Sequence, residues 1–261
     1  MNRIVLLVML VISCFYVQAQ DEGEITKRER IALSKGVFIS GGPSFTLGDN
    51  IGDYSMGYNV SIGFLKRTNR ILSVGSSFSY NSFIYDPEKT TDDYNNIYTG
   101  DVGDYYEGYI MDLEGGNLQL FSLSFDLKVN FVPVRDNSVF SFYAFAKPFV
   151  TMAMLGKITG DVHEYHNYGE EWEFVETHDA RVETDSEITG GIFIGPGVEL
   201  NPAKKISISL QAAFGYTFPV TFISTDSYKE NDLETFFDDD FPLTKKGFPS
   251  VNVSLGLTYN F

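Results

Sequence analysis

The histidines of this 261-residue chain, three in all, lie in one polar segment, residues 156–187. His163, Glu164 and His166 stand close together there, and imidazole and carboxylate groups are ligands of metal ions. Their spacing matches no established metal motif, and no serine stands at a spacing from a histidine that indicates nucleophilic catalysis. The sequence therefore predicts no cofactor, no metal site and no catalytic residue. His163, Glu164 and His166 are the candidate ligands if a metal is bound.

A second set of chemically active side chains consists of charged residues inside stretches of alternating polarity: Asp126, Lys128, Lys147 and Glu199. A short turn around residues 136–137 would place Asp126 opposite Lys147 on paired strands. Lys128 follows two residues along the same face, and Glu199 on the next strand is expected to join from below. Unpaired charges inside a narrow barrel would be costly, so we expect a salt-bridged plug rather than a pore.

The elements that position these residues are eight stretches in which apolar and polar residues alternate, the period typical of β-strands. They run over residues 36–47, 54–65, 71–83, 118–133, 139–155, 188–200, 205–218 and 250–261. Their connections are alternately long and short; the short ones are 66–70, 134–138 and 201–204, and the longer ones 48–53, 84–117, 156–187 and 219–249. This pattern predicts an all-β fold, an eight-stranded antiparallel up-and-down transmembrane β-barrel with short periplasmic turns and long extracellular loops.

The chemistry of the strand faces favours a membrane barrel over a secreted soluble one. Residues 251–261 place valine, leucine, tyrosine and phenylalanine on one face, and asparagine, serine, glycine and threonine on the other. A soluble surface is about a quarter to a third charged, whereas these polar faces carry only the four charges named above, apart from Lys205 at the first position of the stretch 205–218. The apolar faces carry no charge, as a lipid-facing surface requires. Aromatic residues also gather near both ends of the strands, as expected at two membrane boundaries.

Three prolines lie inside predicted strands, on their apolar faces: Pro43, Pro148 and Pro196. Each removes a hydrogen bond from the strand ladder, so a bulge or a break is expected at each. Pro148 and Pro196 lie on neighbouring strands. That wall is therefore either a lateral weak point or a tolerated kink.

The start of the chain indicates export. Arg3 precedes an uncharged apolar run over residues 4–17, and Val17-Gln18-Ala19 offers small residues for cleavage. In the alternative reading, Val11-Ile12-Ser13-Cys14 resembles a lipoprotein box and Cys14 is lipidated. Cleavage after Ala19 would remove Cys14, the only cysteine, and with it all thiol chemistry. We predict three regions: a signal peptide over 1–19, a periplasmic N-terminal segment over 20–35 and an outer-membrane β-barrel over 36–261.

The net charge of −16 is concentrated in the longer connections, which hold 28 of the 35 acidic residues. Nucleic acid is excluded as a ligand, because its binding needs a basic surface. Divalent cations at the acidic loops and a protein partner at the loops are the expected ligands, although acidic runs also simply keep loops solvated. The connection 84–117 is rich in tyrosine, a composition typical both of adaptable binding loops and of strands extended beyond a membrane.

Together these features resemble the small outer-membrane β-barrels of the OmpA/OmpX kind, in the style of porin-family or PorT-like barrel domains. The resemblance rests on Val17-Gln18-Ala19, the eight amphipathic strands and the terminal segment Val253 to Phe261. It implies a location in the cell outer membrane, among outer-membrane lipid and lipopolysaccharide. It also implies that the barrel-assembly machinery reads Leu257, Tyr259 and Phe261 as its C-terminal signal. It brings no catalytic motif.

The predicted function is therefore a non-enzymatic, structural or interaction role exerted through long acidic surface loops. Surface binding, envelope integrity and membership of a secretion or uptake assembly all fit this prediction. A narrow channel for ions or small solutes is the alternative. A membrane-embedded enzyme that modifies lipid is the third hypothesis, less favoured because no motif with a mechanism is present.

Overall fold

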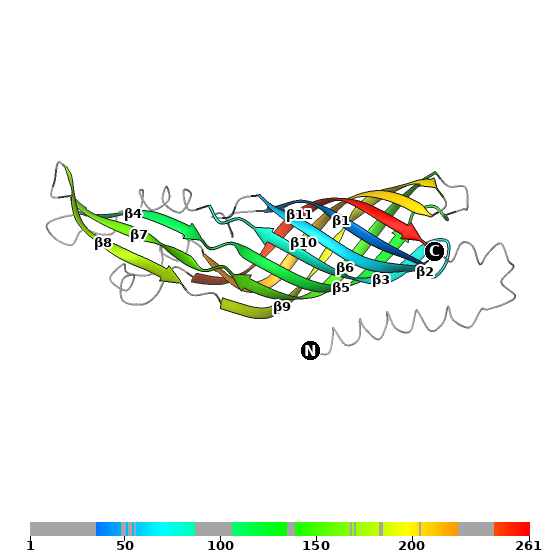
Figure 1. Cartoon of the computed structure of the whole chain (residues 1–261), viewed down its shortest axis with the longest axis horizontal. Coiled ribbons are helices and arrows are strands. Elements are labelled where there is room, and N and C mark those ends of the chain that lie inside the picture. Colours follow the sequence, from blue (N-terminus) through cyan, green and yellow to red (C-terminus); the bar gives the residue numbers. More distant parts are fainter. Residues whose placement is uncertain are drawn as a thin grey trace, which may run out of the picture.

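The computed structural model shows a closed antiparallel β-barrel with a separate three-stranded sheet beyond one end (Figure 1). It describes residues 35–47, 51, 54, 56–86, 106–134, 139–167, 169, 171–182, 185–203, 205–223 and 243–261. The barrel strands are β1 (Lys35–Thr46), β2 (Gly57–Arg67), β3 (Leu72–Phe83), β5 (Leu118–Asn130), β6 (Phe140–Leu155), β9 (Asp185–Ala203), β10 (Ile206–Ile223) and β11 (Leu243–Asn260). Their order around the barrel is β1-β11-β10-β9-β6-β5-β3-β2, closed by pairing between β2 and β1.

Each stretch of alternating residues corresponds to one barrel strand, so the predicted all-β, eight-stranded antiparallel barrel is confirmed. The connections are less simple than predicted. Residues 84–117 and 156–187 contain three further strands: β4 (Tyr106–Gly115), β7 (Ile158–Asn167) and β8 (Trp172–Val182). These form a sheet of order β4-β7-β8, which we call the outer sheet. In addition, β10 and β11 stay paired as far as Ile223 and Leu243, well beyond their predicted ends.

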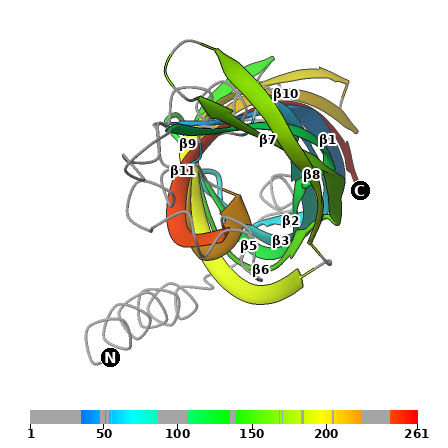
Figure 2. The ribbon, with the colours of Figure 1, turned by 90° about the vertical axis from the view of Figure 1, so that its left-hand side faces the viewer.

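The outer sheet continues one wall of the barrel. Along the chain, β4 leads into β5, β7 follows β6, and β8 leads into β9. The order β4-β7-β8 in the outer sheet therefore matches the order β5-β6-β9 of the barrel strands that it extends. At the junction, Gly115 and Gly116 have φ values of 97° and 72°, a conformation that favours glycine. Gly116 N donates to Lys157 O at 3.1 Å, and Gly156 N donates to Asn117 O at 2.9 Å. Figure 2 views the molecule from this end, with β7 and β8 in front of the barrel.

The opposite end of the barrel carries the short turns and the C-terminus (Figure 1). Backbone hydrogen bonds join its neighbouring segments: Val134 N to Arg70 O at 2.9 Å, Asn201 N to Val139 O at 2.8 Å and Phe261 N to Lys35 O at 2.8 Å. Exposed basic side chains surround this rim: Lys35, Lys66, Arg70 and Lys205. We call it the turn rim.

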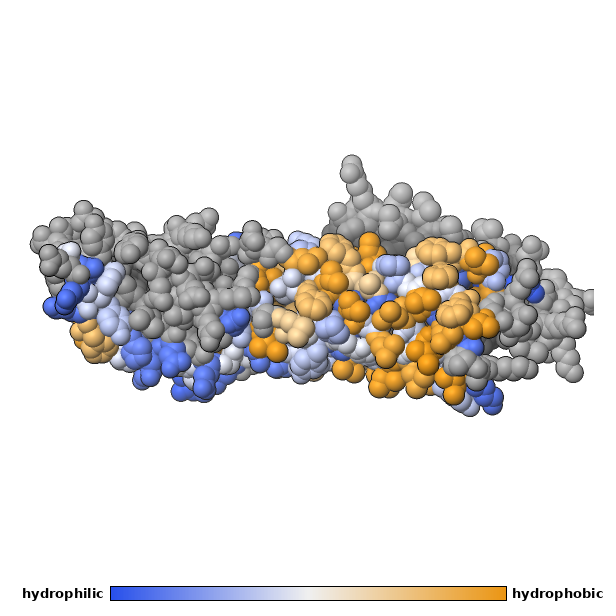
Figure 3. Space-filling view, turned by 90° about the horizontal axis from the view of Figure 1, so that it is seen from above, coloured by the Kyte–Doolittle hydropathy of each residue, from blue (hydrophilic) through white to orange (hydrophobic). Residues whose placement is uncertain are grey.

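The barrel has an apolar outside and a polar inside. Every barrel strand exposes a large apolar side chain, for example Ile39, Ile62, Phe78, Leu123, Val150, Ile194, Leu210 and Leu255. The buried side chains along the same strands are mostly small and polar, among them Ser40, Asn59, Ser61, Ser77, Asn81, Ser124, Asn252 and Ser254. Figure 3 shows the apolar side chains gathered over the barrel part of the molecule. This polarity is the reverse of that of a soluble barrel.

The prolines break the ladder without shifting its register. Pairing is interrupted beside Pro43 between β1 and β11, beside Pro148 between β5 and β6, and beside Pro196 between β9 and β10. The expected breaks are therefore present, and bulges are not formed at these positions. Asn59 compensates at the first break, because its Nδ2 donates to Gly42 O at 2.8 Å and to Pro43 O at 3.2 Å. Between β6 and β9 the pairing is continuous, which favours a tolerated kink over a lateral weak point.

An apolar cluster fills the end of the barrel nearest the outer sheet, and we call it the apolar cap. Its members are Ile51, Tyr54, Phe83, Tyr85, Leu118, Leu120, Ala153, Leu155, Ile158, Val220, Phe222, Ile223 and Phe248. Phe248 meets Phe83 edge to face, with ring centroids 5.5 Å apart. The Tyr54 hydroxyl donates to Gly116 O at 3.2 Å and accepts from Ile223 N at 3.3 Å. The cap therefore closes the barrel and also ties down the base of the outer sheet.

The predicted signal peptide over 1–19, with Cys14, lies outside the described residues, as does the predicted periplasmic segment apart from Lys35. In the part of the chain that the structure describes, no helix has the length and apolar character needed to cross a membrane.

Candidate functional site: the barrel interior and the outer sheet

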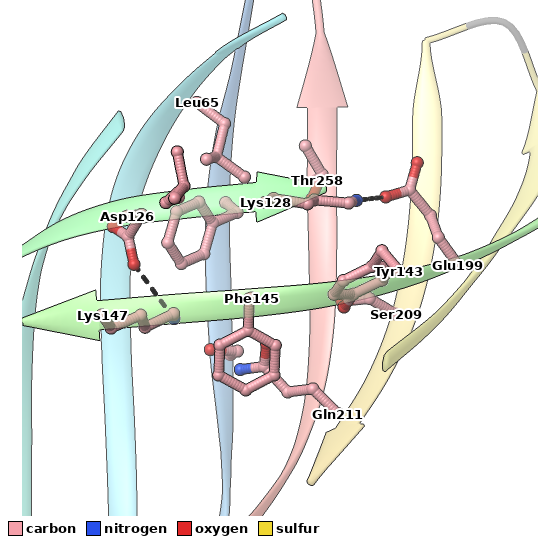
Figure 4. A pocket seen from close by; sticks show the side chains of 13 residues that line it. Leu65, Asp126, Lys128, Tyr143, Phe145, Lys147, Glu199, Ser209, Gln211 and Thr258 are labelled. Carbon is pink, nitrogen blue, oxygen red and sulfur yellow. Dashed lines mark hydrogen bonds and ion pairs between the residues drawn. The ribbon is translucent and has the colours of Figure 1, made fainter. Parts of the chain in front are cut away.

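The four charged residues predicted to face the barrel interior do so, as two ion pairs (Figure 4). Lys128 of β5 bonds Glu199 of β9, with side chains only 12% and 8% exposed. Lys147 Nζ of β6 lies 3.3 Å from Asp126 Oδ1 of β5, with side chains 16% and 4% exposed. The first pair reaches past the intervening strand β6, so it spans part of the interior rather than following the wall.

Two residues missed by the sequence argument belong to this charged layer. Lys128 Nζ lies 4.0 Å from the centroid of the Tyr143 ring, a cation–π contact. Arg67, counted with a turn from the sequence, is the last residue of β2 and acts electrostatically on both Lys128 and Glu199. The alternation of β2 could have revealed it, because Arg67 has the same parity as the inward-facing Asn59 and Ser61. With Arg67 included, the named interior charges are three basic and two acidic.

A layer of small polar side chains lies between the charges and the apolar cap. Asn252 Nδ2 of β11 donates to Asn81 Oδ1 of β3 at 3.0 Å, and Ser254 Oγ of β11 donates to Asn59 Oδ1 of β2 at 2.7 Å. These bonds join strands that are not neighbours, so they cross the interior. In the same layer, the hydroxyl oxygens of Ser77 on β3 and Ser124 on β5 are hydrogen-bonded at 2.7 Å, which joins these two neighbouring strands.

Two cavities of about 40 Å³ each share Ser40, Phe145, Lys147 and Gln211 in their linings. That volume holds about three water molecules in each cavity. Apart from the ion pair with Lys147, the buried carboxylate oxygens of Asp126 receive no hydrogen bond from the described residues, and Asp126 lines one of the cavities. The interior is therefore suited to a few bound waters and to structural ion pairs.

The histidines lie on the outer sheet and not in the barrel. His166 Nε2 lies 2.5 Å from Glu164 Oε1, and His178 Nε2 lies 2.9 Å from Glu164 Oε2. His163 points to the other face, where its Nδ1 is 2.9 Å from Thr177 Oγ1. The candidate set His163, Glu164 and His166 is thus not brought together. Within the described residues, no three His, Cys, Asp or Glu side chains form an arrangement that could hold a metal ion.

Glu187 bridges a split in the barrel wall. Pairing of β9 with β10 ends at Thr217↔Gly191, although both strands continue. Beyond that point Glu187 accepts the Thr221 N–H and pairs with Lys245. The Glu187 side chain therefore joins β9 to β10 and β11 where the backbone pairing between β9 and β10 has ended.

The predicted C-terminal signal residues lie on the outer face of β11 and at its end. Leu257, Tyr259 and Phe261 are all exposed. Leu257 pairs with Ile39 of β1, and Tyr259 with Val37. The terminal strand is thus the element through which β1 and β10 meet, a position compatible with a role in closing the barrel.

No protein-family profile and no curated protein sequence matches the chain. Among solved structures, it is similar to surface protein A of Neisseria, with 12% identity and a TM-score of 0.41, over 88% of this chain and 97% of that one. Ail, the attachment invasion locus protein of Yersinia pestis, gives 12% identity and a TM-score of 0.40, over 88% and 99%. The N-terminal β-barrel domain of Pseudomonas aeruginosa OprF gives 14% and 0.33, over 87% and 97%. Similarity at this level says nothing about what this chain binds.

Proposed function

We propose that this protein is a non-enzymatic, closed outer-membrane β-barrel that holds an acidic sheet at the cell surface for interaction with a partner. One observation carries the proposal: every strand of a closed barrel exposes large apolar side chains and buries polar ones, and no charged side chain stands mid-strand on the outward apolar faces that the structure describes. Closure satisfies the backbone hydrogen bonds that an open sheet would leave unpaired in lipid. The shortest barrel strand has 11 residues, enough for the roughly 9–11 residues of a tilted membrane strand.

The charges support one orientation. The turn rim is basic, whereas the outer sheet carries exposed acidic side chains such as Glu173, Glu176 and Asp179. Short turns face the periplasm in bacterial barrels and longer segments face outward. This orientation places the outer sheet at the cell surface, next to lipopolysaccharide. Divalent cations at the acidic segments, and the barrel-assembly machinery acting on the C-terminal strand, belong to the same proposal.

Fractionation tests the location. The expressed protein is expected in the outer-membrane fraction, and unheated samples should migrate differently from boiled ones on a gel because a folded barrel resists detergent. If the signal peptide is cleaved after Ala19, the mature protein should begin at Gln20. Recovery in the soluble periplasm, with no difference between heated and unheated samples, would contradict the proposal.

The interior argues against the alternative of a channel. The barrel interior is occupied by three layers along its length: two buried ion pairs, hydrogen bonds that cross the interior, and the apolar cap. We expect no steady conductance when the purified barrel is placed in a planar bilayer. Reproducible openings whose size changes in Asp126→Ala or Lys147→Ala would show that ions pass the charged layer, and would replace the proposal with the channel.

A further inference from the structure

One face of the outer sheet combines exposed aromatic and acidic side chains. Alternate residues of a strand share a face, and residues opposite each other in register share it across strands. By this rule one face carries Asp112 of β4, Asp161, His163 and Tyr165 of β7, and Trp172, Phe174, Thr177 and Asp179 of β8. We call it the aromatic–acidic face. The other face carries Glu164, His166, Glu173, Glu176 and His178.

Three aspartates stand side by side on the aromatic–acidic face. Asp112 is opposite Asp161, and Asp161 is opposite Asp179, across all three strands. All three are exposed. Like charges directly opposite each other destabilise a sheet. Arg181, opposite Thr159 in the next row, brings one positive charge to the same face. A cationic group bound over the aspartate row would relieve the remaining repulsion.

An aromatic platform adjoins the aspartate row on this face. The Tyr165 and Phe174 rings meet edge to face with centroids 5.7 Å apart, and the His163 ring lies 6.3 Å from Phe174. Trp172 is 42% exposed and Phe174 is 56% exposed. Exposed aromatic faces attract the ammonium of lysine and, more often, the guanidinium of arginine.

A register shift places this platform next to the aspartates. Glu164 pairs with Glu176, but Tyr165 pairs with Phe174, so Val175 is the extra residue of a β-bulge. Without the bulge, Tyr165 would lie opposite Val175, and Phe174 and Trp172 would turn to the other face. Bulges commonly re-aim side chains in this way. The local geometry thus serves to put aromatic and acidic groups on one surface.

We propose that the aromatic–acidic face binds an extended basic segment of a partner protein. Aspartates would pair with its lysine or arginine side chains, and Phe174 and Trp172 would stack on a guanidinium. On β7, Asp161 and Tyr165 are four residues apart, about 13 Å along the strand. An extended peptide repeats its side chains at the same spacing, so basic residues four apart would reach both groups. This inference rests on the proposed function, because it names the class of partner that the displayed sheet would recognise.

Fluorescence anisotropy tests the proposal with the purified full chain in detergent micelles. The probe is a short labelled peptide with arginine at every fourth position, and its control replaces each arginine by glutamine. Salt is set near the physiological level, where separated exposed charges are screened over about 8 Å. We expect the arginine peptide to bind and the glutamine peptide to fail.

Matched variants separate a defined surface from general negative charge. Asp161→Asn with Asp179→Asn removes two charges from the aromatic–acidic face, and Glu173→Gln with Glu176→Gln removes two from the other face. We expect about a tenfold loss of affinity in the first and less than a twofold loss in the second. Phe174→Ala should cost about fivefold. Equal losses in both double variants, or no binding by the wild-type chain, would overturn the proposal.

The outcome is separable from that of the proposed function. A variant is scored only when its unheated gel mobility matches that of the wild-type chain, so a misfolded sheet or barrel is not read as lost binding. The anisotropy measurement tests peptide binding to the aromatic–acidic face even if fractionation contradicts the membrane location.

Discussion

Arginine in place of Leu255 is expected to lower the free energy of unfolding by about 2–4 kcal/mol when the protein is folded in phospholipid vesicles. Leu255 lies mid-strand on β11, 62% exposed, between Gly41 of β1 and Leu210 of β10. In water, a charge at so exposed a position changes stability by less than about 0.5 kcal/mol. In lipid, the guanidinium must be taken out of water, and this desolvation produces the loss. Denaturant titration of the vesicle-bound protein measures it.

The matched control for that substitution is Phe174→Arg on the outer sheet. Phe174 is 56% exposed, nearly as much as Leu255, but lies beyond the barrel. Its replacement should leave the free energy of unfolding within about 0.5 kcal/mol of the wild type. If both variants lose little, the apolar surface of the barrel does not face lipid, and the proposed location is wrong.

Removal of Lys128 alone is expected to destabilise the barrel by about 3–5 kcal/mol, because it leaves the Glu199 carboxylate buried without its partner. Both side chains are at most 12% exposed. The Lys128→Met and Glu199→Leu double variant should recover most of this loss, since apolar side chains of similar volume need no partner. Denaturant titration of Lys128→Met, Glu199→Leu and the double variant completes the cycle, and Lys128→Ala is measured alongside.

A near-zero effect of Lys128→Ala would instead show that water reaches Glu199 freely. The interior would then be hydrated through the charged layer, and the closed plug would be wrong. The same variant therefore links a stability measurement to the conductance measurement, and the two are expected to agree.

Much of the barrel could be predicted from sequence because one physical requirement acts on every strand. A strand with an apolar outer surface on one side and a packed polar interior on the other must alternate, so Val253, Leu255 and Leu257 identify their own face. The antiparallel pairing of the consecutive strands β5 and β6 likewise brings Asp126 and Lys147 to adjoining strands. No such rule connects Lys128 with Glu199. Their contact depends on the curvature that carries β9 round past β6.

The outer sheet was foreseen only as one alternative for residues 84–117, because the described side chains of β8, and those of β7 beyond Ile158, are exposed or half-buried and impose no period. Tyr165 and Phe174 alternate with glutamate and histidine, and the bulge at Glu164/Tyr165 interrupts the pattern on β8. The apolar cap was missed for a related reason. Phe222 and Phe248 lie where β10 and β11 run beyond the alternating stretches, and their burial depends on Tyr54 and Phe83 from distant parts of the chain.

The sequence by itself determined the number of barrel strands, the polarity of each barrel face and four of the five named interior charges, because these follow from alternation along single strands. Only the tertiary structure decided what those faces enclose and display. Closure of the barrel set the Lys128–Glu199 pair and the apolar cap, since both join residues from strands far apart in the chain. The register of β4, β7 and β8 set the aspartate row and the aromatic platform, because contacts across strands depend on pairing that no single strand encodes.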